Sequence, residues 1–315
     1  MQNSSIQSCQ YNGFSVPEKS YLNILFETLF SKSDKVTPYF YIKRPDIVRC
    51  KLSRMFSNGS GNLQVISDFD RTLSKCFNDD GQLSMLKQTY GSLEFDKYIP
   101  HSLKNPYMLE WWDIAHRVIT SCNVHRDTLK MTLYGSNFQL RDRVPDFMST
   151  LNRHNIPMVI FSAGLGNIIE WILEKEGLLY ENVKVASNFM KFNEKGLLVS
   201  FQSPCIHTFN KTFGGLALSD EDRSVFSKRR CIMLLGDSLF DHRMADGLIE
   251  EDIREDISES STSVILKIGF LNEKIETLLD EYMNLYDIVL TSDGGFELPL
   301  EIVSCIIESE QPKRK

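Results

Sequence analysis

The 315-residue chain lacks any continuous apolar run near the roughly 20 residues that a membrane-spanning helix needs. Its start also lacks the charged and apolar pattern of a signal peptide, so we expect a cytoplasmic protein without membrane association. The seven cysteines show no paired spacing, which argues against a disulfide framework and suits a reducing compartment. Lys and Arg, at 35, are outnumbered by Asp and Glu, at 42. The net charge of −7 argues against a nucleic-acid partner.

Short apolar runs recur along the chain, separated by segments with helical spacing. Because these runs are continuously apolar, we expect parallel strands covered on both faces. The runs are 63–66, 158–161, 183–186, 231–235, 264–268 and 288–290. Gly196 to Phe201 is expected to form one arm of a hairpin added to the same sheet. Helices are expected over 21–30 and 45–56. Residues 76–140 lose the strand pattern and are helical in period, with many aromatic side chains.

The segment from Leu63 to Leu73 (LQVISDFDRTL) places two carboxylates directly after an apolar strand. Ligands of open α/β sheets bind at the carboxyl ends of strands, where Asp68 and Asp70 are expected. Two acids this close repel each other, so a cation or a shared proton is required. A magnesium ion would meet that need and leave one carboxylate free to attack an electrophile that the ion polarises. The ordinary alternative is a strand followed by an acidic turn.

Three later segments contain the partners that such a carboxylate pair needs. A second strand ends at Ser162, and the glycines that follow let backbone amides approach an anion at the start of a helix. Lys211 is a candidate cation for the nucleophile and a phosphate group. A third strand ends near Asp237, with Asp241 four residues on, and both could complete an oxygen-ligand site for Mg²⁺. A strand-to-helix turn, a surface lysine and a metal-free acidic loop are the ordinary alternatives. The occurrence of all three segments in one chain favours a single phosphoryl-transfer site.

These motifs resemble those of the haloacid dehalogenase (HAD) superfamily of phosphatases. The resemblance is closer to one branch, the type III cytosolic 5′-nucleotidases or pyrimidine 5′-nucleotidases, and covers roughly residues 45 to 305. The segments that carry it are 65–70 with 72–74, 106–111, 161–164, 183–185 with 187–190, 234–238 with 243–247, 266–269 and 286–289.

The resemblance implies a Rossmann-like α/β core with a parallel sheet, interrupted after its first strand by an inserted helical cap. A cap that closes over the site would exclude water and select the substrate. On this basis we expect a core over 21–75 and 141–311 and a cap over 76–140. We expect a disordered arm over 1–20, because it is rich in Ser, Gln and Asn, and a short basic tail over 312–315.

Catalytic roles follow from the same resemblance. Asp68 would be the nucleophile that forms an aspartyl-phosphate, and Asp70 the general acid and base. Mg²⁺ would be held by the carboxylates of Asp68 and Asp237 and by the backbone carbonyl of Asp70, with Asp241 in support. The phosphoryl oxygens would be bound by Ser162, the amide of Ala163, and Lys211.

The resemblance also implies nucleoside monophosphate substrates, recognised by the cap. Glu94 matches a cap glutamate that binds the nucleotide base in family members. Trp111 and Trp112 are candidates to stack on the base, although at least one is expected to be a core residue of the cap. A positively charged methylated purine would gain a cation–π interaction there. CMP and UMP are the leading substrates, with 7-methyl-GMP as the competitor.

Three departures from the family pattern stand out. Ala115 occupies the position of a substrate-contacting serine, and the segment 75–82 is shorter than in relatives. Arg71 replaces a residue that is more often apolar, and we expect it to point outward. Two other functions stay open: another capped phosphatase, acting on phosphoserine or a sugar phosphate, and a non-catalytic nucleotide-binding protein. We expect a monomer, with phosphotransfer to a second nucleoside as a side activity.

Overall fold

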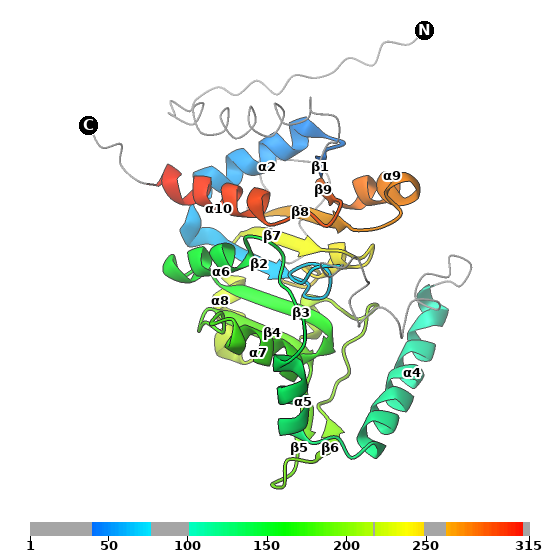
Figure 1. Ribbon diagram of the computed structural model, residues 1–315. Coiled ribbons are helices and arrows are strands. Elements are labelled where there is room, and N and C mark those ends of the chain that lie inside the picture. Colours follow the sequence, from blue (N-terminus) through cyan, green and yellow to red (C-terminus); the bar gives the residue numbers. More distant parts are fainter. Residues whose placement is uncertain (1–39, 77–100, 217, 249–262, 311–315) are drawn as a thin grey trace.

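A seven-stranded sheet forms the centre of the computed structural model, which describes residues 40–76, 101–216, 218–248 and 263–310 (Figure 1). The strands are ordered β1-β9-β8-β7-β2-β3-β4. Only β1 is antiparallel to its neighbour. The bounds are β1 Phe40–Tyr41, β2 Leu63–Ser67, β3 Met158–Leu165, β4 Val183–Asn188, β7 Cys231–Gly236, β8 Val264–Leu271 and β9 Ile288–Thr291. This confirms the predicted α/β class and its parallel sheet.

The chain reverses its direction across the sheet between β2 and β7. From β2 it proceeds outward to β3 and β4, and it then returns to the other side of β2 to build β7, β8 and β9. Ser67 of β2 is in register with Leu235 of β7, so both strands end at the same edge. Such a reversal leaves a crevice at the carboxyl ends of the strands, where open α/β folds bind ligands.

Helices cover both faces of the sheet, which explains why the strands are continuously apolar. On one face lie α2 (Pro45–Asn58), α6 (Val144–Arg153), α7 (Gly166–Lys175) and α10 (Glu297–Ser309). On the other lie α8 (Asp220–Ser227) and α9 (Ile275–Leu285). Alternate residues of one strand serve the two cores: Val65 of β2 packs with the first layer and Ile66 with the second.

Helix α6 shows how the sequence sets this packing. Val144, Phe147, Met148 and Leu151 are spaced by three and four residues, so they lie on one face of the helix, and all four are fully buried. Burying a side chain of this size contributes roughly 1.5–3 kcal/mol relative to leaving it exposed. The α6 face therefore fixes the helix against the sheet beside β2.

A second layer of structure projects from the core: helices α4 (His101–Ser121) and α5 (Arg126–Tyr134) and the hairpin of β5 (Met190–Phe192) and β6 (Leu198–Phe201) (Figure 1). The prediction that this hairpin joins the main sheet was wrong, because β5 and β6 pair only with each other. Its apolar residues Met190 and Leu198 pack instead with Trp171 of α7 and with half-buried side chains of α4 and α5. The hairpin thus serves as a platform for the cap helices.

Several predictions concern residues outside the described ranges. These are the disordered arm over 1–20, the helix over 21–30, the basic tail over 312–315 and most of the shortened segment 75–82. The helix expected over 45–56 is confirmed as α2. Within the described ranges, no helix combines the length and apolarity needed to cross a bilayer.

Candidate active site

Asp68 lies immediately after β2, in the crevice left by the chain reversal. Its backbone amide donates a hydrogen bond to the carbonyl of Leu235 at 2.9 Å, which extends the pairing of β2 with β7 by one residue. Its Oδ1 accepts a hydrogen bond from Nζ of Lys211 at 2.5 Å. Its Oδ2 is buried and has no hydrogen-bond partner among the described residues. One carboxylate oxygen is therefore anchored and the other is available for an incoming group.

Lys211 is the buried cation of the site. Only 5% of its side chain is exposed, and Nζ lies 2.5 Å from Asp68 Oδ1 and 2.8 Å from Asp241 Oδ1. Burial alone would lower the pKa of Lys211, but the carboxylates of Asp241 and Asp68 raise it above its ordinary value. The ammonium group therefore stays charged. It holds the strand that carries Asp68 to the loop that carries Asp241.

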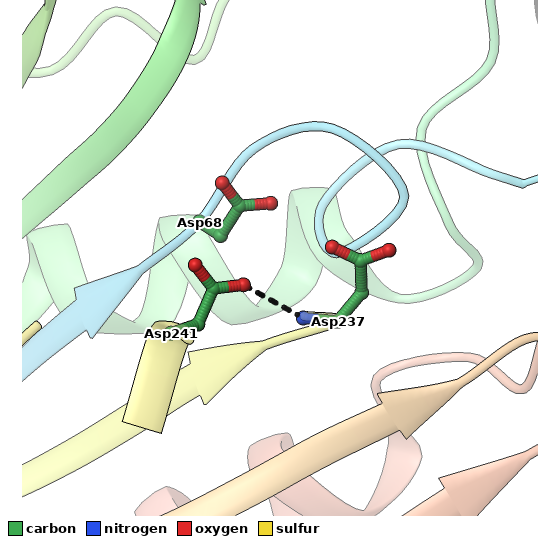
Figure 2. Close-up of side chains that lie close together, drawn as sticks. All are labelled: Asp68, Asp237 and Asp241. Atoms are coloured by element: carbon green, nitrogen blue, oxygen red, sulfur yellow. Dashed lines mark hydrogen bonds between the residues drawn. The ribbon is translucent and has the colours of Figure 1, made fainter. Parts of the chain in front are cut away.

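The loop after β7 is fixed by hydrogen bonds within the loop and by hydrogen bonds from two tyrosines. Asp241 Oδ2 accepts hydrogen bonds from the amides of Asp237 at 3.2 Å and Ser238 at 3.0 Å (Figure 2). A Cβ on Gly236 would lie 2.4 Å from the Cβ of Asp241, so this turn requires glycine. The hydroxyls of Tyr282, in α9, and Tyr286, directly after α9, donate to the carbonyls of Asp237 and Ser238, each at 2.5 Å. The backbone is fixed while the Asp237 carboxylate is left to face Asp68.

The acids of this cluster fit a divalent cation. Asp68, Asp237 and Asp241 each place one carboxylate oxygen within 4.8 Å of the others (Figure 2). Burial raises the pKa of Asp68 well above its ordinary value and that of Asp237 to about 7, because the ionised forms lose their hydration. A bound cation would remove that cost. Buried oxygen donors, one of them unpartnered, suit a hard ion of the Mg²⁺ or Ca²⁺ type.

Asp70 and Ser162 meet on the other side of Asp68. Ser162 Oγ donates to Asp70 Oδ2 at 3.4 Å and accepts from the Gly164 amide at 2.9 Å. A Cβ at Gly164 would lie 2.9 Å from Asp70 Oδ2, so a larger residue here would displace the Asp70 carboxylate. Burial raises the pKa of Asp70, and Lys211 opposes that rise. A raised pKa means that this carboxyl group keeps a proton more readily, which suits a group that gives and takes protons.

Arg71 does not point outward, and that prediction was wrong. Its Nη1 lies 3.3 Å from Asp237 Oδ2, its Nη2 lies 3.5 Å from Glu273 Oε2, and its Nε donates to Cys76 Sγ at 3.2 Å. The physical reason is the backbone: φ of Arg71 is 62°, a left-handed conformation that turns the side chain back over the site. Arg141 fixes this conformation by donating from Nη2 to the Arg71 carbonyl at 2.5 Å.

The residues predicted to recognise the base lie apart from the acid cluster or outside the described ranges. Trp112 is on α4, half-buried, with its ring centroid 5.3 Å from that of His116, which in turn stacks on Phe201 of β6 at 3.8 Å. Trp111 is on the same helix, but its side chain is not described, and Glu94 lies outside the described residues. Ala115 is also half-buried on α4. Base recognition by the cap therefore stays a prediction.

The sequence reasoning missed four residues that shape the site: Arg71, Arg141, Tyr282 and Tyr286. Arg141 is fully buried and bonds to the carbonyl of Gly294, to Asn272 and to Asp293 as well as to Arg71. No local pattern marks these residues, because their partners are far away in the sequence. Tyr286 belongs to a segment that carries the family resemblance, which was the one available signal.

The fold and site together define a class of protein. Carboxylates follow two adjacent parallel strands, a hydroxyl group lies near the carboxyl end of a third, a buried lysine joins two of the acids, and helices α4 and α5 project from the core (Figure 1). This is the arrangement of a capped HAD-type hydrolase.

Comparison with known proteins places the chain more narrowly. It belongs to the pyrimidine 5′-nucleotidase (UMPH-1) family, which matches residues 50–307. It is 35% identical over 288 residues to the 7-methylguanosine phosphate-specific 5′-nucleotidase A of Xenopus laevis, covering 85% of this chain and 94% of that protein. The human 7-methylguanosine phosphate-specific 5′-nucleotidase is 34% identical over 279 residues, covering 82% and 89%. The crystal structure of cytosolic 5′-nucleotidase IIIB bound to cytidine superposes with a TM-score of 0.76 at 30% identity, covering 89% of this chain and 98% of that one.

Proposed function

We propose that this chain is a magnesium-dependent 5′-nucleotidase that hydrolyses nucleoside 5′-monophosphates to nucleoside and phosphate. The observation that carries the proposal is the buried cluster at the chain reversal, where Asp68 has one oxygen anchored by Lys211 and the other without a partner. The family and the printed activities of its members supply the substrate class. We expect the enzyme to act as a cytoplasmic monomer.

The reaction would take place in two displacements at phosphorus. In the first, a carboxylate oxygen of Asp68 forms a bond to phosphorus while the bond from phosphorus to the nucleoside 5′ oxygen breaks, and Asp70 gives its proton to that oxygen. In the second, Asp70 takes a proton from a water molecule whose oxygen attacks the same phosphorus, and the Asp68 carboxylate is released. Proton transfer of this kind contributes typically ~10²–10⁴-fold in rate.

Several groups would stabilise the charge that develops on the phosphoryl oxygens. Lys211 already faces Asp68 at 2.5 Å, and Ser162 and the amide of Ala163 lie at the end of β3 beside Asp70. Asp68, Asp237 and the carbonyl of Asp70 would hold Mg²⁺, with Asp241 bracing the loop. When bound, the ion supplies Lewis-acid polarisation of a phosphoryl oxygen and lowers the repulsion between phosphate and carboxylates.

Substrate choice would depend on the cap. Trp111 and Trp112 lie on α4, where an indole ring can stack on a nucleobase, and Glu94 would accept hydrogen bonds from an exocyclic amine or ring N–H. The relatives named for 7-methylguanosine phosphate and the structure solved with cytidine support two candidates, 7-methyl-GMP and the pyrimidine monophosphates CMP and UMP. A nucleoside hydroxyl group that replaced the attacking water would give phosphotransfer instead of hydrolysis.

Phosphate release from a panel of monophosphates tests the proposal. The panel holds CMP, UMP, AMP, GMP, 7-methyl-GMP, phosphoserine and an aryl phosphate, each with Mg²⁺ and with a chelator, and Asp68→Asn is the matched control. We expect Mg²⁺-dependent release from CMP, UMP or 7-methyl-GMP, and none from the variant. Release from phosphoserine or the aryl phosphate alone would instead indicate another capped phosphatase. A protein that binds nucleotides without any release would be a non-catalytic member.

A further inference from the structure

We propose that Arg71 is a built-in counter-charge of the metal site, which pairs with Asp237 and thereby weakens the binding of the divalent cation. The inference rests on the proposed metal site, but it concerns Arg71, which has no role in the proposed reaction. Arg71 would act through Asp237, which makes it a positioning residue and not a catalytic one.

The contacts of Arg71 place its charge at the edge of the acid cluster. Nη1 lies 3.3 Å from Oδ2 of Asp237, one of the three acids whose oxygens lie within 4.8 Å of one another. Only 20% of the Arg71 side chain is exposed, so water screens this charge incompletely. A cation that approached Asp237 would meet a guanidinium already on one of its two oxygens.

The backbone keeps Arg71 in this place. Its left-handed φ of 62° is fixed by three hydrogen bonds. The Ser74 hydroxyl accepts from the Arg71 amide at 2.8 Å, while Arg141 and Asn272 donate to the Arg71 carbonyl at 2.5 Å and 3.0 Å. The side chain therefore starts from an anchored position. The guanidinium can still change its carboxylate partner.

Glu273 supplies the second carboxylate. Its Oε2 lies 3.5 Å from Nη2 of Arg71, whereas Asp237 is contacted by the other terminal nitrogen, Nη1. When a divalent cation takes Asp237, the guanidinium can keep Glu273 as its partner and move away from the ion. Cation binding and the Arg71–Asp237 pair therefore oppose each other, and the cost of breaking that pair reduces the affinity for the ion.

Charge arithmetic gives the direction of the effect. Arg71 adds one positive charge beside Asp237, one of the three acids that would hold the cation. Its removal makes the surroundings of those acids more negative by one charge, which favours a divalent ion. Orientation of Asp237 by the guanidinium would work in the opposite direction. At a site this buried we expect the charge effect to dominate.

Calorimetric titration of substrate-free protein with Mg²⁺ tests the inference without any turnover. We expect Arg71→Met to bind Mg²⁺ about three- to tenfold more tightly than wild type, since one nearby positive charge is removed. Arg71→Lys keeps the charge and should stay close to wild type. Arg143→Met is the matched control, because Arg143 also has a left-handed φ, 68°, and pairs with a carboxylate, Asp146, away from the acid cluster.

The outcomes separate this inference from the proposed function. Equal or weaker Mg²⁺ binding by Arg71→Met, with wild-type binding intact, overturns the role of Arg71 alone. In the equal case, a rise in the inhibition constant of inorganic phosphate would show that Arg71 contacts the phosphoryl group instead. Absence of Mg²⁺ binding in wild type overturns both. If Arg71→Met fails to fold, as circular dichroism would reveal, the neutral Arg71→Gln carries the same expectation.

Discussion

The acid cluster and the cap helices differ in how firmly the fold holds them. In the acid cluster, Lys211 and its two partners are at most 8% exposed, and each of the three takes part in an ion pair. On α4 and α5, by contrast, apolar side chains such as Val118 and Met131 are 56% and 75% exposed. An ion pair between α5 and α7, Lys130 with Glu174, is partly exposed to water.

This difference indicates which part of the molecule can move at low cost. The cap rests on a small cluster with three buried members, Trp171, Met190 and Leu198. Opening a contact of that size costs far less than disturbing the sheet, whose two cores contain dozens of buried side chains. The proposed chemistry would then belong to the firmly held part, and the proposed substrate selection to the cap.

The largest expected effect comes from removing the buried cation. Lys211→Met leaves Asp68 and Asp241 facing each other without a counter-charge, and breaking a buried ion pair in this way costs about 3–5 kcal/mol of unfolding free energy. Urea unfolding in the presence of chelator measures it. Lys130→Met, which breaks an exposed pair of the cap, is the matched control and should leave the unfolding midpoint unchanged. Equal losses in the two variants would remove the contrast between the regions.

A second prediction concerns pH and the turn that carries Lys211. His207 is fully buried, and burial lowers its pKa from 6.5 to about 4. In the unfolded chain His207 therefore becomes protonated below pH 6.5, whereas in the folded chain it becomes protonated only near pH 4. Stability must fall as the pH drops through this window, by up to about 3 kcal/mol. Urea unfolding at pH 6.5 and 4.5 should show a smaller loss for His207→Gln than for wild type.

The matched control for this measurement is His154→Gln, which replaces an exposed imidazole at the end of α6. A pH-dependent loss in His207→Gln equal to that of wild type would show that other groups cause the acid sensitivity. In that case the neutral ring of His207, whose Nδ1 accepts from the Phe209 amide at 3.2 Å, has no part in it.

A substitution in the cap should change the choice of substrate and leave the phosphoryl-transfer step unchanged. We expect Trp112→Ala to lower kcat/KM for CMP or 7-methyl-GMP by roughly tenfold, the size of one base–aromatic stacking interaction. Turnover of a small aryl phosphate, which needs no base recognition, should be unchanged. Steady-state kinetics with both substrates checks this. Loss of both activities to the same degree would mean that Trp112 holds the cap together, through His116 and Phe201, and does not contact the base.

The smallest expected effect comes from removing one hydrogen bond that holds the loop of the acid cluster. Tyr282→Phe removes only the hydroxyl that donates to the Asp237 carbonyl, so we expect a loss of about 1 kcal/mol in unfolding free energy. It should also raise the Mg²⁺ concentration needed for half-maximal activity by a few-fold, because Asp237 is held less firmly. Tyr180→Phe, on a half-buried tyrosine at the far end of the sheet, is the control. A stability loss with no change in metal dependence would limit Tyr282 to packing.

Much of the core site could be predicted from the sequence, for a physical reason. Parallel strands share one carboxyl edge, so residues directly after apolar runs, such as Asp68, Ser162 and Asp237, must come together wherever the strands are neighbours. Lys211 follows no strand, and it was a candidate only because the acids and a phosphate group need a nearby cation. The structure places it between Asp68 and Asp241.

The remaining features depend on contacts that no local pattern encodes. The direction of Arg71 is set by hydrogen bonds from Arg141 and Asn272, which lie 70 and 201 residues further along the chain. Asp241 was predicted to support the metal, but its two oxygens also bind Lys211 and the amides of its own loop. The β5–β6 hairpin has the alternation of a sheet strand, but its apolar residues pack with Trp171 of α7 and with side chains of α4 and α5.

The chain reversal at β2 has a consequence for the order in which the protein becomes active. Asp68 and Lys211 are separated by 143 residues, and Asp241 follows 30 residues later. A growing chain on the ribosome therefore carries Asp68, the proposed nucleophile, long before it carries the lysine and the acids that would complete the site. During synthesis the early segment has no means of cleaving a nucleotide. Enzymatic activity would thus report that the second half of the sheet has been made and has docked beside the first.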